Sequence, residues 1–127
     1  MEENKIKLKQ FVIVPKQPKM SKGKIASQVA HAIYMAIKNH RNKPAAGADN
    51  IIIDEWEKSG MCVIVLKARD TNHLNDIAKY LEQWNIPHHL YIDEGLFGCD
   101  PFTPTALATG VLDETQHWYF EKMELFK

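Results

Sequence analysis

The sequence predicts an α/β fold, a three-layer α/β/α sandwich with a mixed and mostly four-stranded central sheet. Short apolar runs alternate along the chain with segments whose apolar residues recur at helical spacing. This alternation is typical of strands packed between helices. The chain has 127 residues, which is enough for one domain with a substantial core. We therefore expect residues 1–127 to form a single domain, with a flexible segment at residues 1–8.

The first strand is expected over residues 9–15, because prolines follow its apolar run. A helix is expected from about Lys22 to about Asn39, with the side chain of Ser21 capping its start. At about 100° per residue, one broad apolar arc of this helix contains Ile25, Ala26, Val29, Ala30, Ala32, Ile33, Ala36 and Ile37. A stripe on the opposite side consists of Lys24, Gln28, His31 and Met35.

The later elements follow from the same patterns. Residues 41–50 have the composition of a long loop, and a short helix is expected at 51–58. The continuous apolar run 61–66 predicts a strand buried on both faces, and therefore a central one. Helical spacing returns over 72–84. The remaining expected elements are strands at 89–93 and 105–111, a last helix from Asp113 to about Phe120 and an edge strand at 123–126.

Composition argues against several classes of protein. The formal net charge is zero, unlike that of a non-specific nucleic-acid binder coated with positive charge. No apolar run reaches membrane-spanning length, and the first residues lack the apolar core of a signal peptide. The two cysteines fit neither a disulfide framework nor a metal-ligand spacing. We therefore expect a cytoplasmic protein with no membrane partner, no metal and no cofactor.

Lysines crowd the start of the chain, and two of them lie at a predicted helix start. Lys22 and Lys24 fall in the first helical turn, where the helix dipole disfavours cations. A phosphate bound there would neutralise them, although both side chains can also simply point into water. Asp93 ends a predicted strand. Because sites in open α/β sheets lie at strand ends and helix starts, the Lys22 turn and Asp93 are the two leading candidates.

A set of short motifs occurs in order along nearly the whole chain. The set consists of Lys9-Gln10-Phe11-Val12-Ile13-Val14, Lys19-Met20-Ser21-Lys22-Gly23-Lys24-Ile25-Ala26, Gln28-Val29-Ala30-His31-Ala32, Val63-Ile64-Val65-Leu66-Lys67, Asp93-x-Gly95, Thr103-x-Thr105, Leu107-Ala108-x-Gly110 and Leu125-Phe126-Lys127. In this order the motifs resemble the archaeal and eukaryotic, or type 2, peptidyl-tRNA hydrolases. The resemblance implies an α/β/α domain that hydrolyses the ester joining a peptide to tRNA, with tRNA as its partner.

The resemblance also implies roles for single residues. Lys22, Asp93 and Thr105 fall on the family's catalytic positions. The substrate-binding residues beside them would be Lys24, Gln28, His31 and Thr103. Ester hydrolysis needs a placed water, a proton acceptor and stabilisation of the oxyanion. Asp93 would orient or deprotonate the water, Lys22 would stabilise the oxyanion or keep Asp93 ionised, and Thr105 would add a hydrogen bond. A carboxylate of ordinary acidity is a weak base at neutral pH, so positioning of the water is the role expected of Asp93.

One loop departs from the family pattern. Phe97 stands where the family usually has a threonine, and Glu94 stands where it has a small residue. Two alternatives therefore stay open: a weak or inactive member that binds RNA or a protein, and an esterase for another acylated substrate. Structural roles also stay open, with Asp93 as a salt bridge at a strand end and His31 as a packing residue. A homodimer is likewise left open.

Overall fold

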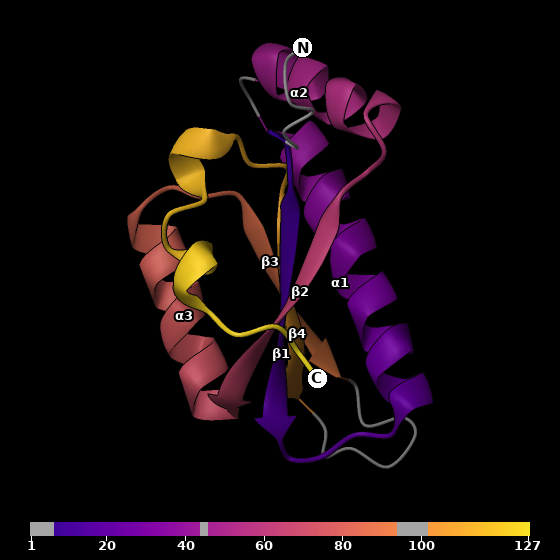
Figure 1. The fold of residues 1–127 in the computed structure, drawn as a ribbon, viewed down its shortest axis with the longest axis vertical. Helices are drawn as coiled ribbons and strands as arrows, with labels where there is room; N and C mark the ends of the chain where they lie inside the picture. The colour runs from indigo at the N-terminus through magenta and orange to yellow at the C-terminus, as the bar shows by residue number, and fades with distance from the viewer. Residues whose placement is uncertain (1–6, 44–45, 94–101) are drawn as a thin grey trace, which may run out of the picture.

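A computed structural model describes residues 7–43, 46–93 and 102–127. Four strands, three α-helices and two short 3₁₀ helices make up the described chain (Figure 1). In chain order they are β1 (Gln10–Gln17), α1 (Lys22–Arg41), α2 (Ala46–Lys58), β2 (Val63–Asp70), α3 (Thr71–Gln83), β3 (His88–Asp93), β4 (Thr103–Thr109), η2 (Glu114–Gln116) and η3 (Phe120–Lys122).

The strands form one mixed sheet in the order β2-β1-β4-β3. β1 pairs parallel with β2 and antiparallel with β4, which in turn pairs antiparallel with β3. β1, β2 and β3 therefore run in the same direction. We call the end of the sheet at which these three strands finish the carboxyl end of the sheet. α1 and α3 also begin there, because each follows directly after β1 or β2.

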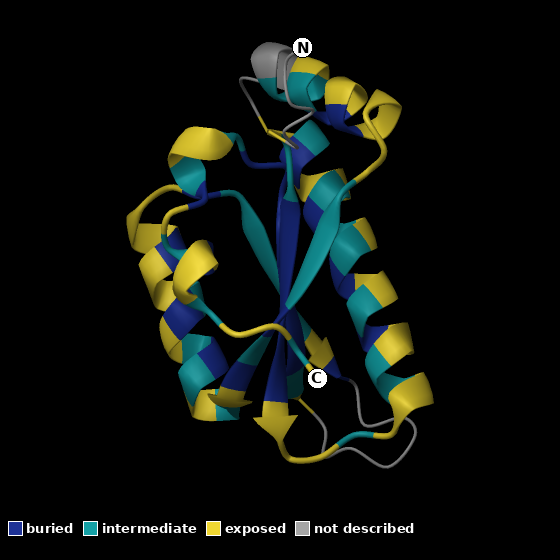
Figure 2. Cartoon of the chain, viewed as in Figure 1, coloured by how far each residue is buried: buried dark blue, intermediate teal, exposed yellow. Residues whose placement is uncertain are grey.

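Alternate residues of β1 pack against different helices. Phe11 lies in a buried cluster with Leu74 of α3, whereas Val12 lies in another with Ala32 and Ala36 of α1. Successive side chains of a strand point to opposite faces, so α1 and α3 cover opposite faces of the sheet (Figure 1). Figure 2 shows the buried strands enclosed between helices whose outer faces are exposed. The predicted α/β class and its mixed four-stranded sheet are confirmed.

α1 meets the sheet through a face that the apolar pattern did not predict. Its buried residues follow one another at four-residue spacing: Gln28, Ala32, Ala36 and His40. Ala26 and Ala30 are exposed, so their place in the expected buried arc is wrong. The side chain of Lys24 is only 9% exposed, so the expectation that the Lys24 and Gln28 stripe faces solvent is also wrong. The small side chains of Ala32 and Ala36 allow close packing, and polar partners described below compensate for the burial of Gln28.

β1 continues past the point where proline was expected to end it. Its pairing with β2 extends to Gln17, whereas its pairing with β4 ends at Ile13. Pro15 therefore lies beyond the part of β1 that bonds to β4, and its missing N–H interrupts no ladder bond on that side. The expected stop at Pro15 is wrong for this reason.

β2 is an edge strand and not the central strand that its apolar run predicted. It begins at Val63 and has β1 as its only strand neighbour in the described sheet. The C-terminal segment covers its outer side, since the Lys67 amide donates to the Glu124 carbonyl at 2.9 Å and the Phe126 amide donates to the Val65 carbonyl at 3.0 Å. The edge strand expected at 123–126 is thus reduced to a single bridge between Leu66 and Leu125.

Two further expectations differ from the structure. α2 begins at Ala46, inside the segment 41–50 that was expected to be a loop. The last helix, expected from Asp113 to Phe120, is replaced by η2 and η3. Asp113 caps η2, and His117 lies 3.0 Å through Nε2 from the Leu112 carbonyl, which ties the chain back before a full helix can form. No helix in the described ranges is long and apolar enough to cross a membrane.

Candidate active site

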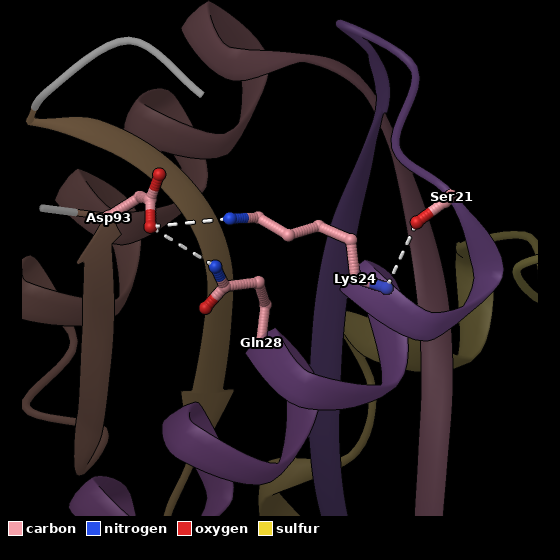
Figure 3. Close-up of polar contacts among 4 residues, drawn as sticks. All are labelled: Ser21, Lys24, Gln28 and Asp93. Atoms are coloured by element: carbon pink, nitrogen blue, oxygen red, sulfur yellow. Dashed lines mark hydrogen bonds and ion pairs between the residues drawn. The ribbon is translucent and has the colours of Figure 1, made fainter. Parts of the chain in front are cut away.

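The first turn of α1 is fixed by its cap. Ser21 has an extended backbone, and its hydroxyl oxygen accepts a hydrogen bond from the Lys24 amide at 3.2 Å (Figure 3). The predicted cap is therefore confirmed. Lys24 and Gln28 are four residues apart, so their side chains lie on the same face of the helix. Figure 3 shows both side chains directed toward Asp93 at the end of β3.

Asp93 is a buried carboxylate held through one oxygen. It is 4% exposed. Its Oδ1 lies 3.5 Å from Lys24 Nζ and accepts a hydrogen bond from Gln28 Nε2 at 3.3 Å (Figure 3). Its Oδ2 is buried and has no hydrogen-bond partner within the described chain. One oxygen thus fixes the orientation of the carboxylate, and the other is left to accept a hydrogen bond from a bound molecule.

A bulge in β4 places two threonines beside Asp93. Thr103 pairs directly with Asp93, and directly opposed residues share one face of a sheet. Tyr91 pairs with Ala106 and the next residue of β3 pairs with Pro104, so Thr105 is an extra residue without a cross-strand partner. Bulges of this kind redirect a side chain and are frequent next to active sites. Thr105 is 2% exposed, and its Oγ1 lacks a hydrogen-bond partner among the described residues.

His31 and Lys22 lie differently from the residues above. The ring of His31 stacks on Tyr91 with a centroid distance of 5.0 Å and an interplanar angle of 12°. Tyr91 precedes Asp93 by two residues in β3, so His31 lies beside the carboxylate on the same face of the sheet. Lys22 is the exposed first residue of α1, and its ammonium forms no ion pair within the described ranges. The structure therefore brings Lys24, Gln28 and Thr103 to Asp93 but does not pair Lys22 with it.

A second buried polar group closes the other end of α1, and sequence reasoning missed it. His40 is 3% exposed. Its Nδ1 accepts from the Val111 amide at 3.2 Å, and its Nε2 lies 3.2 Å from Asp49 Oδ1. Burial lowers the pKa of His40 below its usual 6.5, although Asp49 acts in the opposite direction. The backbone of Gly110 approaches the ring so closely that a Cβ there would lie 2.4 Å from Nδ1. A histidine at helical spacing from Ala36 was the available signal.

The site combines groups that suit hydrolysis. The described residues contain no cluster of three or more His, Cys, Asp or Glu side chains able to hold a metal ion. The carboxyl end of the sheet instead presents a buried carboxylate, two threonine hydroxyls and a lysine ammonium. A carboxylate can orient water, and hydroxyl and ammonium groups can stabilise developing negative charge. This fold and site are those of an α/β hydrolase-type enzyme that acts through its own side chains.

Comparison with known proteins gives the family. The family model described as peptidyl-tRNA hydrolase PTH2 matches residues 8–126. The chain is 37% identical over 105 residues to the peptidyl-tRNA hydrolase of Thermococcus sibiricus, covering 82% of this chain and 84% of that protein. It is 36% identical over 107 residues to that of Thermococcus onnurineus, covering 84% and 86%. It is 32% identical over 102 residues to that of Methanopyrus kandleri, covering 80% and 83%.

The chain belongs to the peptidyl-tRNA hydrolase PTH2 family. It is accordingly a hydrolase, and the resemblance inferred from its motifs is confirmed. The loop in which the sequence departs from the family pattern, including Glu94 and Phe97, lies outside the described residues.

Proposed function

We propose that this protein hydrolyses the ester bond between the peptide and the tRNA of peptidyl-tRNA. The membership of the chain in the PTH2 family supports this substrate. The observation that carries the proposal is the state of Asp93, whose Oδ1 is held by Lys24 and Gln28 while Oδ2 is buried without a partner. A carboxylate anchored in this way is suited to orient one water molecule for attack.

In the proposed reaction, Asp93 Oδ2 accepts a hydrogen bond from a water molecule and aims its oxygen at the ester carbonyl carbon. The water oxygen bonds to that carbon, and the bond between the carbon and the ribose oxygen breaks. One hydrogen of the water passes, by way of Asp93, to the ribose oxygen, so the products are a peptide acid and a tRNA with a free hydroxyl. Holding the reactants in this geometry lowers the entropic part of the barrier.

The surrounding side chains take complementary roles in this proposal. Lys24 orients Asp93, which its position 3.5 Å from Oδ1 supports. Thr105 donates a hydrogen bond from its buried hydroxyl to the developing oxyanion, and Thr103 acts beside it. Lys22 is exposed at the start of α1, where its ammonium can meet either the oxyanion or a phosphate of the incoming tRNA.

The test is release of the N-acyl-amino acid from an N-acyl-aminoacyl-tRNA by wild type and by Asp93→Asn. The substitution keeps the shape of the side chain but weakens its hold on the water. We expect kcat to fall by about 100-fold or more, the usual effect of losing a positioned acid–base group. Asp76→Asn, at an exposed position of α3, removes one carboxylate elsewhere and should leave kcat unchanged.

Two results would count against this function. Equal turnover by wild type and Asp93→Asn would remove Asp93 from the reaction. A folded wild type that releases no N-acyl-amino acid would favour the weak or inactive alternative, in which the chain binds RNA or a protein, or a different ester substrate. Circular dichroism of each variant shows that the comparison is made between folded proteins.

A further inference from the structure

A basic pocket lies beside β2, outside the site described above. It is a cavity of about 470 Å³ formed by the ends of β1 and β2, the first turn of α3 and the segment around η3. The side chains that supply positive charge or hydrogen-bond donors are Lys16, Lys67, Arg69, His73 and Lys122. Glu124 is the only acidic residue of its lining. In a chain whose formal net charge is zero, this pocket is a local concentration of positive charge, which a concave surface focuses.

The donors of this basic pocket are arranged for an anion. The Nδ1 of His73 accepts a hydrogen bond from the Arg69 amide at 3.0 Å, so the proton of the neutral ring is on Nε2, where it can be donated. Arg69 is exposed, and its planar guanidinium can bind two phosphate oxygens at once. Lys67 Nζ lies 3.1 Å from Glu124, whose side chain is 80% exposed. Such an exposed pair is weak, so Glu124 can turn into solvent when an anion enters.

The topology relates the basic pocket to Asp93. Lys16 and Arg69 lie near the ends of β1 and β2, and Asp93 ends β3. These three strands run in the same direction, so the pocket and Asp93 both lie at the carboxyl end of the sheet. β2 and β3 are its two edge strands. Three strand spacings of about 4.8 Å separate them by about 14 Å. A polyanion whose ester reached Asp93 could therefore also reach the basic pocket.

Aromatic rings next to the basic pocket favour a nucleic acid over other anions. Tyr119 lines the pocket, and its ring centroid is 5.2 Å from that of Trp84. Trp84 in turn contacts Tyr80 and Trp118, with centroid distances of 5.6 Å and 5.0 Å. Tyr80, Trp84 and Trp118 are 47%, 39% and 50% exposed. A basic groove beside exposed aromatic rings is the combination that binds single-stranded nucleic acid, through phosphate contacts and base stacking.

We propose that the basic pocket binds backbone phosphates of the tRNA whose ester bond is cleaved at Asp93. The inference rests on the proposed function for the identity of the bound molecule. It assigns the pocket to substrate binding and not to chemistry. Removing its cations should therefore weaken binding of the tRNA and leave the reaction step unchanged.

The test compares Lys16→Ala/Arg69→Ala with Lys38→Ala/Lys58→Ala. Each double variant removes two exposed cations, but Lys38 and Lys58 lie on α1 and α2, away from the basic pocket. Binding of deacylated tRNA is measured by fluorescence anisotropy at several salt concentrations, and KM and kcat are measured with N-acyl-aminoacyl-tRNA. For the pocket variant we expect Kd and KM to rise about tenfold and the salt slope of log K to decrease by about one per lost contact. Its kcat, and all constants of the control variant, should stay within about twofold of wild type.

The outcomes separate this inference from the proposed function. If wild type hydrolyses the substrate but both double variants bind tRNA equally well, the pocket inference is overturned and the function stands. If wild type is inactive but only the pocket variant loses tRNA affinity, the function fails and the pocket is still a tRNA site. Titration with inorganic phosphate, followed through the imidazole resonances of His73, covers a small-anion site. Binding of phosphate there together with equal tRNA affinity in both variants would overturn the inference.

Discussion

Asp93 takes its properties from two side chains on a helix far away in the sequence. Lys24 and Gln28 both contact the same carboxylate oxygen, at 3.5 Å and 3.3 Å. The Lys24 and Asp93 side chains are 9% and 6% exposed, so neither charge is compensated by water. A buried pair of this kind contributes little net stability, but removal of one partner is costly because the other charge stays buried.

A substitution at Lys24 should therefore be strongly destabilising. We expect Lys24→Met to lower the free energy of unfolding by roughly 3 kcal/mol, because Asp93 loses the partner of its buried charge. Lys38→Met, at an exposed position of the same helix, should change it by less than about 0.5 kcal/mol. Urea unfolding of both variants measures the difference.

A double variant separates stability from activity. Lys24→Met/Asp93→Leu removes both charges, so we expect stability to recover while hydrolysis stays absent. Equal unfolding free energies for wild type and Lys24→Met would contradict a buried ion pair between Lys24 and Asp93.

At the scale of the element, α1 is fastened at both ends by buried polar contacts. Lys24 and Gln28 attach its first turns to β3, and His40 attaches its last turn to Val111 and Asp49. Between these ends the helix packs through small alanines. The orientation of α1 about its own axis is therefore set by its polar contacts as well as by its apolar surface.

The contact at His40 should make stability depend on pH. Burial lowers the pKa of His40 below 6.5, so the unfolded state binds its proton more readily than the folded state does. The free energy of unfolding should be fully maintained above about pH 7.5. It should fall as the pH drops through 6.5 toward the folded-state pKa, with a slope of at most about 1.4 kcal/mol per pH unit for this group.

The measurement is urea unfolding between pH 5.5 and pH 8 for wild type and His40→Gln. The pKa of His89 is also lowered, by burial and then by His88, but His89 is present in both proteins and cancels in the comparison. We expect a shallower decline for His40→Gln. The same slope in the two proteins would show that His40 does not carry the effect.

Elements were predictable where the pattern is local. Helical spacing and the apolar run of β1 placed α1, α3 and the sheet, and Ser21 marked a helix start correctly. The burial of Lys24 was not predictable in this way, because its partner Asp93 is 69 residues away in sequence. The apolar run of β2 predicted burial but not a central position, because the cover over its edge comes from the C-terminal segment. Motifs identified most of the site, whereas Gln28 and Lys24 acquired their contacts only through tertiary packing.

At the scale of the molecule, the sheet directs its polar groups to one end and its exposed aromatic rings to the side of α3. Asp93 and the basic pocket occupy the carboxyl end of the sheet. Trp84 and Trp118 extend from this region over α3 and are 39% and 50% exposed, whereas Trp56 is 2% exposed. The three tryptophans of the chain thus report separately on a surface and on the core.

This difference gives a direct optical test of the tRNA-binding face. Acrylamide should quench the fluorescence of Trp84 and Trp118 efficiently, and added tRNA should protect both through stacking of its bases. In Trp84→Phe/Trp118→Phe only the buried Trp56 is left, so quenching should be weak with or without tRNA. Quenching of wild type that is unchanged by saturating tRNA would place the nucleic acid on another face.

The bulge in β4 also determines which mutations this site can tolerate. Thr103 and Ala106 are three residues apart, yet they oppose Asp93 and Tyr91, which are two residues apart. The strand therefore changes phase at Thr105, and the side chains before and after it obey different alternations. A substitution at Thr105 would alter one hydroxyl, but deletion of the codon would restore simple alternation and turn Thr103 to the other face of the sheet. Insertions and deletions in β4 should accordingly be far rarer among functional variants than changes of residue type.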